Sequence, residues 1–233
     1  MKMRLDKMLA HCGYGSRKEV KKYIRCKEVM VNGQMITDDD YKVDMDEDEV
    51  MVFNQNITYH ELLYIMLNKP KGVVTATFDL KETTILDLVD EYASYKIFPV
   101  GRLDKDTTGL LLITNDGQLC HQLLSPKNHV DKKYFVEFEG TFLPEYYEKF
   151  EKGIVLEDGY LTLPATIELS SNNTAMLTIH EGKFHQVKRM FMALGLKVIA
   201  LKRISFGSLI LDRNLKEGEY RLLTEMEIAM LNK

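Results

Sequence analysis

The sequence contains no tryptophan and has only three cysteines and five prolines in 233 residues. Cys12, Cys26 and Cys120 are odd in number and widely spaced, and none belongs to a C-x-x-C pair. This pattern argues against a disulfide framework and against a cysteine-based zinc site, so we expect three reduced thiols. With 14 glycines and 45% hydrophobic residues, the composition excludes a collagen-like or disordered chain and is sufficient for a buried core.

Long apolar runs are also missing. The longest, residues 62–67 and 110–113, fall far short of the roughly 18 residues that a membrane-spanning helix needs. The charged N-terminus is not followed by the apolar run of a signal peptide. We therefore expect a cytoplasmic protein with no membrane contact, and the length allows one or two domains.

The formal net charge of −4 conceals two segments of opposite sign. Residues 1–27 hold nine basic residues against two acidic ones, whereas residues 28–60 hold one basic residue against nine acidic ones. The first segment is therefore suited to a polyanion, and the second is suited to keeping one away.

Residues 1–57 are predicted to form a small module with two helices and a hairpin. A first helix ends at Gly13, and Ser16 with Glu19 forms a capping box for a second helix. Asn32-Gly33 between two β-prone runs predicts a tight hairpin. Basic residues gather on one face of the second helix: Arg17, Lys18, Lys21, Lys22 and Arg25. Such a face is either simply solvated or a surface that contacts nucleic-acid phosphates.

After a linker at residues 58–61, residues 62–233 contain short strand-like runs with few helical segments. The expected strands are residues 64–67, 73–77, 110–114, 134–138, 174–179 and 209–211. This pattern predicts an α+β fold with a mainly antiparallel mixed sheet, and no G-x-G-x-x-G or P-loop motif is present.

The segment 100–109 is a polar loop that precedes a predicted buried strand. Arg102 and Asp104 are two residues apart, so in an extended segment they project to the same side. A neighbouring guanidinium keeps a carboxylate ionised, and such an aspartate can act as nucleophile, general base or metal ligand. The alternative is a surface loop that contains an ordinary Arg-Asp pair.

A predicted amphipathic helix begins near Val187 and is closed by Gly195. Lys188 and Arg189 lie in its first turn, where the helix dipole disfavours cations. Either they meet an anion or a carboxylate there, or they are surface cations that extend into solvent.

Several of these motifs, in this order, resemble the bacterial rRNA pseudouridine synthases. They are Leu-Asn-Lys-Pro-Lys-Gly at 67–72, Gly-Arg-Leu-Asp at 101–104, Lys-Tyr at 133–134 and Gln-Val-Lys-Arg-Met at 186–190. Residues 1–57 resemble the S4 RNA-binding domain that these enzymes carry. Residues 106–109 and 184–191 are most similar to the subgroup that acts on small-subunit rRNA.

The resemblance implies a role for four residues. Asp104 matches the aspartate nucleophile, and Tyr134 matches the tyrosine that stacks on uracil and is a candidate for removing the C5 proton. Lys188 matches a basic residue that pairs with the aspartate. Arg102 is similar to the arginine that holds the gap left by the flipped nucleotide.

The implied reaction converts one uridine of 16S rRNA, at position 516 of that RNA, to pseudouridine without a cofactor or a metal. The expected partner is 16S rRNA or a small-subunit assembly intermediate, and the expected protein is a monomer. Predicted RNA contacts are Arg4, Arg17, Lys18, Lys21, Lys22, Arg25, Lys69, Lys71, Lys133, His185, Gln186, Arg189, Lys202 and Arg203. The alternatives are a large-subunit rRNA pseudouridine synthase, a non-catalytic RNA-binding assembly factor, and an enzyme in which Asp104 and Asp106 bind magnesium.

Overall fold

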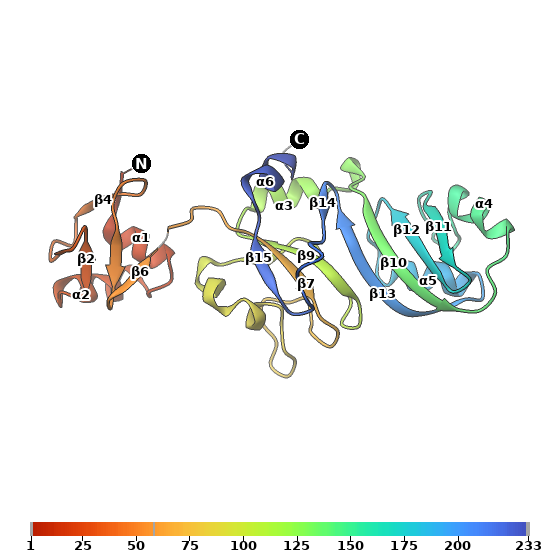
Figure 1. The fold of residues 1–233 in the computed structure, drawn as a ribbon, viewed down its shortest axis with the longest axis horizontal. Helices are drawn as coiled ribbons and strands as arrows, with labels where there is room; N and C mark the ends of the chain where they lie inside the picture. Colours follow the sequence, from red (N-terminus) through yellow and green to blue (C-terminus); the bar gives the residue numbers. More distant parts are fainter. Residues whose placement is uncertain (1, 58, 232–233) are drawn as a thin grey trace. The chain divides into compact units, whose positions relative to one another are not determined.

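A computed structural model of the protein describes residues 2–57 and 59–231. The chain forms two compact units (Figure 1). One holds the described residues up to Leu63 together with Asp90–Ile97, and the other holds the remaining described residues. The predicted boundaries did not set the segment 90–97 apart, and Thr58 of the predicted linker lies outside the described residues. Within the described part of the chain, no helix is long and apolar enough to cross a membrane.

The first unit packs two helices against short strands. The helices are α1 (Leu5–His11) and α2 (Arg17–Arg25). Strand β1 (Lys2–Arg4) pairs with β4 (Lys42–Asp44), and a second sheet has the order β3 (Gln34–Met35), β2 (Val29–Val31), β5 (Val50–Val52), β6 (Gln55–Ile57). The capping box is confirmed, since Ser16 and Glu19 exchange hydrogen bonds. Asn32 and Gly33 both have positive φ, 51° and 75°, as the predicted hairpin between β2 and β3 requires.

The short helix η2 (Asp90–Tyr95) belongs to the first unit through its last residue. The Tyr95 ring lies 5.6 Å from the His11 ring, and Tyr59 lies 5.4 Å from the same histidine. The Tyr95 hydroxyl also forms a hydrogen bond with Cys12, and burial raises the pKa of this tyrosine well above its usual range.

The second unit is built on one mixed sheet, as predicted for an α+β fold. Its order is β11 (Thr166–Ser171), β12 (Thr174–Ile179), β10 (Lys132–Glu139), β13 (Lys197–Phe206), β9 (Thr108–Thr114), β7 (Tyr64–Lys69), β15 (Tyr220–Leu222). Strand β14 (Leu209–Ile210) pairs with β13, and β8 (Phe98–Pro99) pairs with β9. The predicted strand at 73–77 is wrong: only Val74 forms a bridge, to Thr84, because Thr75 is engaged with another loop.

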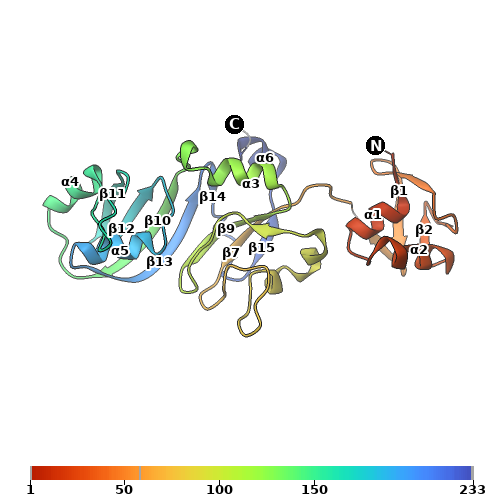
Figure 2. The same ribbon diagram turned by 180° about the vertical axis from the view of Figure 1, so that it is seen from behind.

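Helices cover the sheet in two groups (Figures 1 and 2). Helices α3 (Gly117–Leu124) and α6 (Glu225–Leu231) pack on alternate residues of β7 and β9. Helices α4 (Glu145–Lys152) and α5 (Gln186–Ala193) cover the β10 part, where aromatic rings of α4, α5 and β10 meet. Two single turns, η1 (Leu86–Leu88) and η3 (Pro126–Asn128), complete the described elements.

The two parts of the sheet join at the β9–β13 seam, which is its only parallel pairing within the described residues. This seam consists of the residue pairs Lys202–Thr108 and Arg203–Gly109. Gly109 has φ +99°, and a Cβ there would lie 2.3 Å from the Arg203 carbonyl oxygen. Only glycine permits this close approach. The seam therefore holds the loop before β9 next to β13 and β10.

Candidate active site

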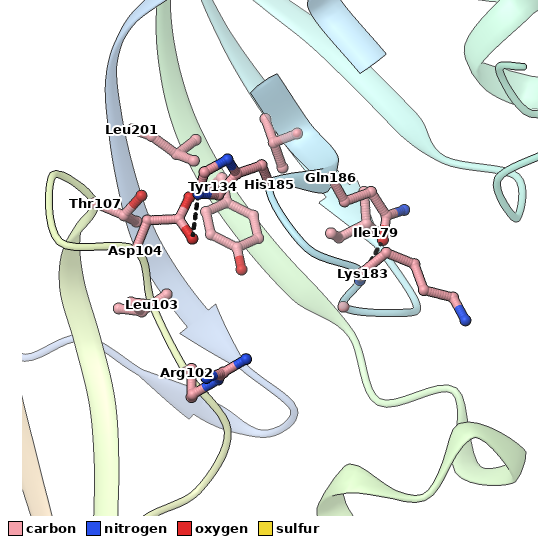
Figure 3. A pocket seen from close by; sticks show the side chains of 12 residues that line it. Arg102, Leu103, Asp104, Thr107, Tyr134, Ile179, Lys183, His185, Gln186 and Leu201 are labelled. Atoms are coloured by element: carbon pink, nitrogen blue, oxygen red, sulfur yellow. Dashed lines mark hydrogen bonds and ion pairs between the residues drawn. The ribbon is translucent and has the colours of Figure 1, made fainter. Parts of the chain in front are cut away.

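A cleft opens where the loop before β9 faces β10 and the segment that leads into α5 (Figure 3). Its inner pocket, of about 70 Å³, is lined by Asp104 and Tyr134 together with residues that flank them. The adjoining outer cleft has a volume of about 1,100 Å³ and is also lined by Asp104. Three of the four residues with an implied catalytic role line the pocket, namely Arg102, Asp104 and Tyr134, and the fourth, Lys188, lines the outer cleft.

A buried lysine, Lys69, binds the backbone of the loop that carries Asp104. The Lys69 side chain has no solvent exposure, and its Nζ donates to the carbonyl oxygens of Asp104 (3.1 Å) and Thr107 (3.0 Å). It also reaches the carbonyl oxygens of Pro70 and Lys105. One ammonium therefore ties together the backbone of the whole turn.

Two further contacts from the segment after β7 fix the same loop. The Thr75 hydroxyl donates to the Leu103 carbonyl (2.7 Å) and accepts from the Leu103 N–H (3.2 Å). The Gly72 N–H donates to the Lys105 carbonyl at 2.8 Å. Thr75 could not be predicted from the sequence, because nothing in a Val-Val-Thr-Ala-Thr run indicates a contact 28 residues away.

Burial has an electrostatic consequence for Lys69. Desolvation lowers the pKa of its ammonium to about 8, although the charges of Asp106 and Asp104 act in the opposite direction. Lys69 was predicted as an RNA contact, and this prediction is wrong because no part of the side chain reaches the surface.

Two basic side chains lie beside the Asp104 carboxylate, which is 26% exposed. Lys188 Nζ lies 3.3 Å from Asp104 Oδ2 and donates to Asp106 Oδ1 at 2.5 Å. His185 Nε2 lies 3.6 Å from Asp104 Oδ1. Burial raises the pKa of Asp106, but the hydrogen bond and charge of Lys188 outweigh it and leave this pKa below its ordinary value.

Arg102 does not form the expected ion pair with Asp104. Its side chain is exposed, and within the described part of the chain no ion pair joins the two residues. Figure 3 shows the guanidinium directed away from the carboxylate. The i, i+2 argument fails because the segment is not extended: Gly101 has φ +76° and the chain turns immediately after Asp104. Arg102 still lines the pocket.

The Tyr134 ring lies beside the Asp104 carboxylate (Figure 3). Tyr134, Val136 and Phe138 share the buried face of β10, as their alternation predicted. Tyr134 pairs in register with Arg203 of β13. Burial raises the pKa of the Tyr134 hydroxyl, while the positive charge of Arg203 acts against this rise.

Both cations in the first turn of α5 meet carboxylates, one of the outcomes that the sequence left open. Lys188 meets Asp104 and Asp106 as described above. Arg189 Nε lies 2.7 Å from Glu157 Oε1, and its Nη2 lies 2.5 Å from Asp158. The predicted RNA contact by Arg189 is therefore not supported, because acidic side chains already occupy its guanidinium.

Two more predicted RNA contacts, Gln186 and Arg203, are not supported, because their side chains are buried and bonded within the protein; Gln186 nevertheless lines the inner pocket. Gln186 donates to Glu181 Oε1 at 2.9 Å and accepts from the Lys183 N–H at 2.9 Å. Arg203 Nε donates to the Leu110 carbonyl at 2.7 Å, across the seam. Both residues form hydrogen bonds that hold neighbouring segments of the site together.

The remaining predicted RNA contacts divide into two groups. Arg4 and Arg17 bind the buried Asp6, with Lys21 3.9 Å from it. Arg25 pairs with Asp39. The predicted contacts that stay at least partly exposed with no ion pair between described residues are Lys18, Lys22, Lys71, Lys133 and Lys202.

The same architecture is found in known proteins. Residues 63–193 match the family described as RNA pseudouridylate synthase, and residues 3–50 match the S4 domain. The uncharacterized RNA pseudouridine synthase YtzG of Bacillus subtilis is 49% identical over 99% of this chain and 98% of its own length. Ribosomal small subunit pseudouridine synthase A of Vibrio cholerae is 44% identical (98% and 99%), and that of Escherichia coli K12 is 42% identical (97% and 99%).

A solved structure has the same fold over nearly the full length. The crystal structure of a pseudouridylate synthase superposes with a TM-score of 0.70 at 39% identity and covers 98% of this chain and 99% of its own. The chain therefore belongs to the RNA pseudouridylate synthase family and is an isomerase that carries an N-terminal S4 domain.

Proposed function

We propose that the protein converts a uridine of 16S rRNA to pseudouridine, and that Asp104 is the nucleophile. The observation that carries the proposal is the position of Asp104, whose carboxylate faces the pocket while Lys188 and His185 contact its two oxygens. The small-subunit substrate is supported by the relatives named for it. By the same similarity, we propose position 516 of that RNA.

The reaction requires that uracil leave the C1′ atom, turn and rejoin through C5. Asp104 attacks the target nucleotide and holds it covalently while the C1′–N1 bond breaks and the base turns, and the bond to Asp104 breaks again once uracil has rejoined through C5. The proton released from C5 needs an acceptor, and Tyr134, which lines the pocket, is the candidate. Because burial raises the pKa of Tyr134, its hydroxyl is protonated before reaction. It must therefore pass its own proton to solvent as it takes the C5 proton, while N1, released from C1′, takes up a proton in exchange.

The target nucleotide must first leave the RNA stack, since a stacked uridine hides its glycosidic bond. The exposed side chain of Arg102, at the rim of the pocket, is suited to the space that the nucleotide vacates. We propose that Lys18, Lys22, Lys71, Lys133 and Lys202 contact phosphates of the surrounding RNA. The substrate is then 16S rRNA or a small-subunit assembly intermediate in the cytoplasm, bound by a monomer.

A magnesium site at Asp104 and Asp106 is disfavoured by the position of Lys188. Its ammonium lies between the two carboxylates and contacts both, so it already supplies the cation that would balance them. Within the described residues, no group of three or more His, Cys, Asp or Glu side chains is arranged to hold a metal ion.

The proposed function is tested by tritium release from 16S rRNA labelled at uridine C5, with EDTA present. Wild type should release tritium and Asp104→Asn should lose at least about 10⁴-fold, because the covalent step is gone. RNA binding should be unchanged in the variant. Full activity of Asp104→Asn would contradict the mechanism, and sequencing of the product would identify the uridine.

A further inference from the structure

A second cavity lies next to the proposed catalytic pocket and has no part in the chemistry described above. It has a volume of about 380 Å³ and lies between the α3–η3 region and the segment that follows β12. The cavity shares Gly182 and Lys183 with the catalytic pocket, and it shares Leu124 with the outer cleft. The three spaces are therefore neighbours that share one wall.

One side of this cavity is apolar and aromatic. Leu123, Leu124, Val130 and Leu163 supply aliphatic surface, and Tyr160 supplies a ring. Leu124 is 42% exposed, whereas the preceding residue, Leu123, is buried. A flat apolar group would remove this surface from water.

Two lysines, Lys132 and Lys183, lie on the rim of the cavity. His129, His180 and one acidic residue, Glu181, also line it, and His180 Nδ1 lies 2.7 Å from Asp131 Oδ1. An anionic group would meet this rim favourably.

The carboxylate of Glu181 is already fully engaged. Its Oε2 accepts from the Tyr160 hydroxyl at 2.6 Å. Its Oε1 accepts from the Leu163 N–H and from Gln186, both at 2.9 Å. These contacts also hold the Tyr160 ring in place. Lys183 Nζ lies 4.8 Å from the centroid of that ring, so a cation and an aromatic surface stand together.

We propose that this cavity binds the nucleotide adjacent to the target uridine on the same RNA strand, with the base against Tyr160 and the leucines and the phosphate at Lys183. The proposal rests on the proposed function. An RNA strand whose target nucleotide enters the catalytic pocket must place a neighbouring nucleotide within one residue of it, and the shared wall at Gly182 and Lys183 is where the strand passes. Unpaired bases bind to aromatic side chains in this way, with cations at their phosphates.

Such a site reads the nucleotide beside the target and therefore contributes to the choice of uridine. Flanking nucleotides set sequence context in other enzymes that flip a base.

The test combines protein variants with altered RNA. The substrate is full-length 16S rRNA ligated from fragments, in which each neighbour of the modified uridine is replaced in turn by an abasic nucleotide. Full-length wild type, Tyr160→Ala, Tyr160→Phe and Lys183→Met are compared by kcat/KM for pseudouridine formation.

On intact RNA, Tyr160→Ala and Lys183→Met should each lose roughly tenfold in kcat/KM, whereas Tyr160→Phe keeps the ring, loses only its hydrogen bond to Glu181, and should lose clearly less than Tyr160→Ala. Wild type should lose about as much when one particular neighbour is abasic. Tyr160→Ala should lose little more on that RNA, because the contact is already gone.

Two control variants carry the same kinds of substitution at positions that do not line the cavity. Tyr147→Ala removes another partly exposed tyrosine, and Lys149→Met removes another lysine that lies over a tyrosine ring, that of Tyr146 at 5.1 Å. Both should behave as wild type on every RNA.

The inference would be overturned if Tyr160→Ala lost as much kcat/KM again on the abasic RNA as wild type does. It would also be overturned if no abasic neighbour lowered kcat/KM for wild type. In both cases the proposed function would stand. No pseudouridine from wild type on intact RNA would overturn the proposed function, and the inference with it.

Discussion

Asp6 and Asp104 are both carboxylates that face cations, yet they differ in what surrounds them. Asp6 has no solvent exposure and accepts hydrogen bonds from both Arg4 and Arg17, the shortest at 2.8 Å. Asp104 is 26% exposed, and its cations stand at 3.3 Å and 3.6 Å. The first is enclosed by guanidinium groups, and the second is open to a pocket.

The difference in their surroundings suits Asp6 to a structural role and Asp104 to a chemical one. Burial raises the pKa of Asp6, but the hydrogen bonds from the arginines outweigh it and lower this pKa overall. With every lone pair engaged, Asp6 has nothing left to offer a substrate. Asp104 lies beside a single lysine and a histidine and next to an accessible space, as the proposed nucleophile requires.

The largest expected effect on stability comes from Asp6→Asn. Loss of the charge leaves Arg4 and Arg17 without their buried partner, so the free energy of unfolding should fall by about 3–5 kcal/mol. The control is Asp40→Asn, since Asp40 is 69% exposed and also pairs with Arg4. It should cost less than about 1 kcal/mol. Chemical denaturation of the full chain measures both, and equal losses would show that Asp6 is no more structural than a surface residue.

Lys188→Met should lower kcat by about a hundredfold, because a preorganised cation beside Asp104, the proposed nucleophile, is removed. The stability should change little, since Lys188 is partly exposed. Lys152→Met removes a surface lysine that pairs with Glu148 on α4 and should leave kcat unchanged. Single-turnover assays on 16S rRNA provide the comparison. A Lys188→Met enzyme with wild-type kcat would show that the lysine beside Asp104 takes no part in the reaction.

Lys69 predicts a stability that depends on pH. Its pKa is about 8 in the folded chain and 10.5 as an ordinary lysine. Between these values the unfolded chain binds a proton that the folded chain lacks, so this residue makes the fold more stable as pH rises from about 8 to 10.5. The contribution is lowest below pH 8.

The difference in unfolding free energy between wild type and Lys69→Met should therefore grow by about 1–3 kcal/mol across that range. Denaturation curves at several pH values measure it. The exposed Lys71→Met, which leaves Lys69 in place, serves as the control. A flat difference for Lys69→Met would mean that this lysine titrates like one on the surface.

The smallest expected effect concerns the exposed cations of α2. The double variant Lys18→Gln, Lys22→Gln should reduce the slope of log K for rRNA against log salt by about 1.4 to 1.8, if each lysine neutralises one phosphate. Arg25→Gln should change the slope less, because Arg25 is already paired with Asp39. Filter-binding titrations at several salt concentrations measure the slopes. If Arg25→Gln changed the slope as much as each lysine substitution does, the ion pair between Arg25 and Asp39 would have to open when RNA binds.

Local signals in the sequence predicted local structure well. The capping box at Ser16, the Asn32-Gly33 hairpin and the closure of α5 at Gly195 each depend on residues within one turn. The α+β class also followed from short strand-like runs, because a period of two is visible in a few residues.

Burial of charged residues was not predictable in the same way. Lys69 lies in a Lys-Pro-Lys-Gly turn that looks solvated, and its partners are carbonyl groups some 35 residues further along the chain. Arg203 is buried because the seam brings the Leu110 carbonyl to it from 93 positions away. Sequence spacing carries no trace of such distant contacts. Only the family resemblance, which gathers the four motifs into one site, placed Lys188 beside Asp104.

The β9–β13 seam also determines when activity can arise during folding. Asp104 precedes β9, whereas Tyr134 and Lys188 come from the segment 132–206 on the other side of the seam. Parallel pairing between strands that lie about 90 residues apart along the chain closes a long loop, which carries an entropic cost that local pairings avoid. The proposed catalytic residues meet only once this long-range pairing has formed. The recovery of pseudouridine formation during refolding would therefore report the seam, which the recovery of local secondary structure would not.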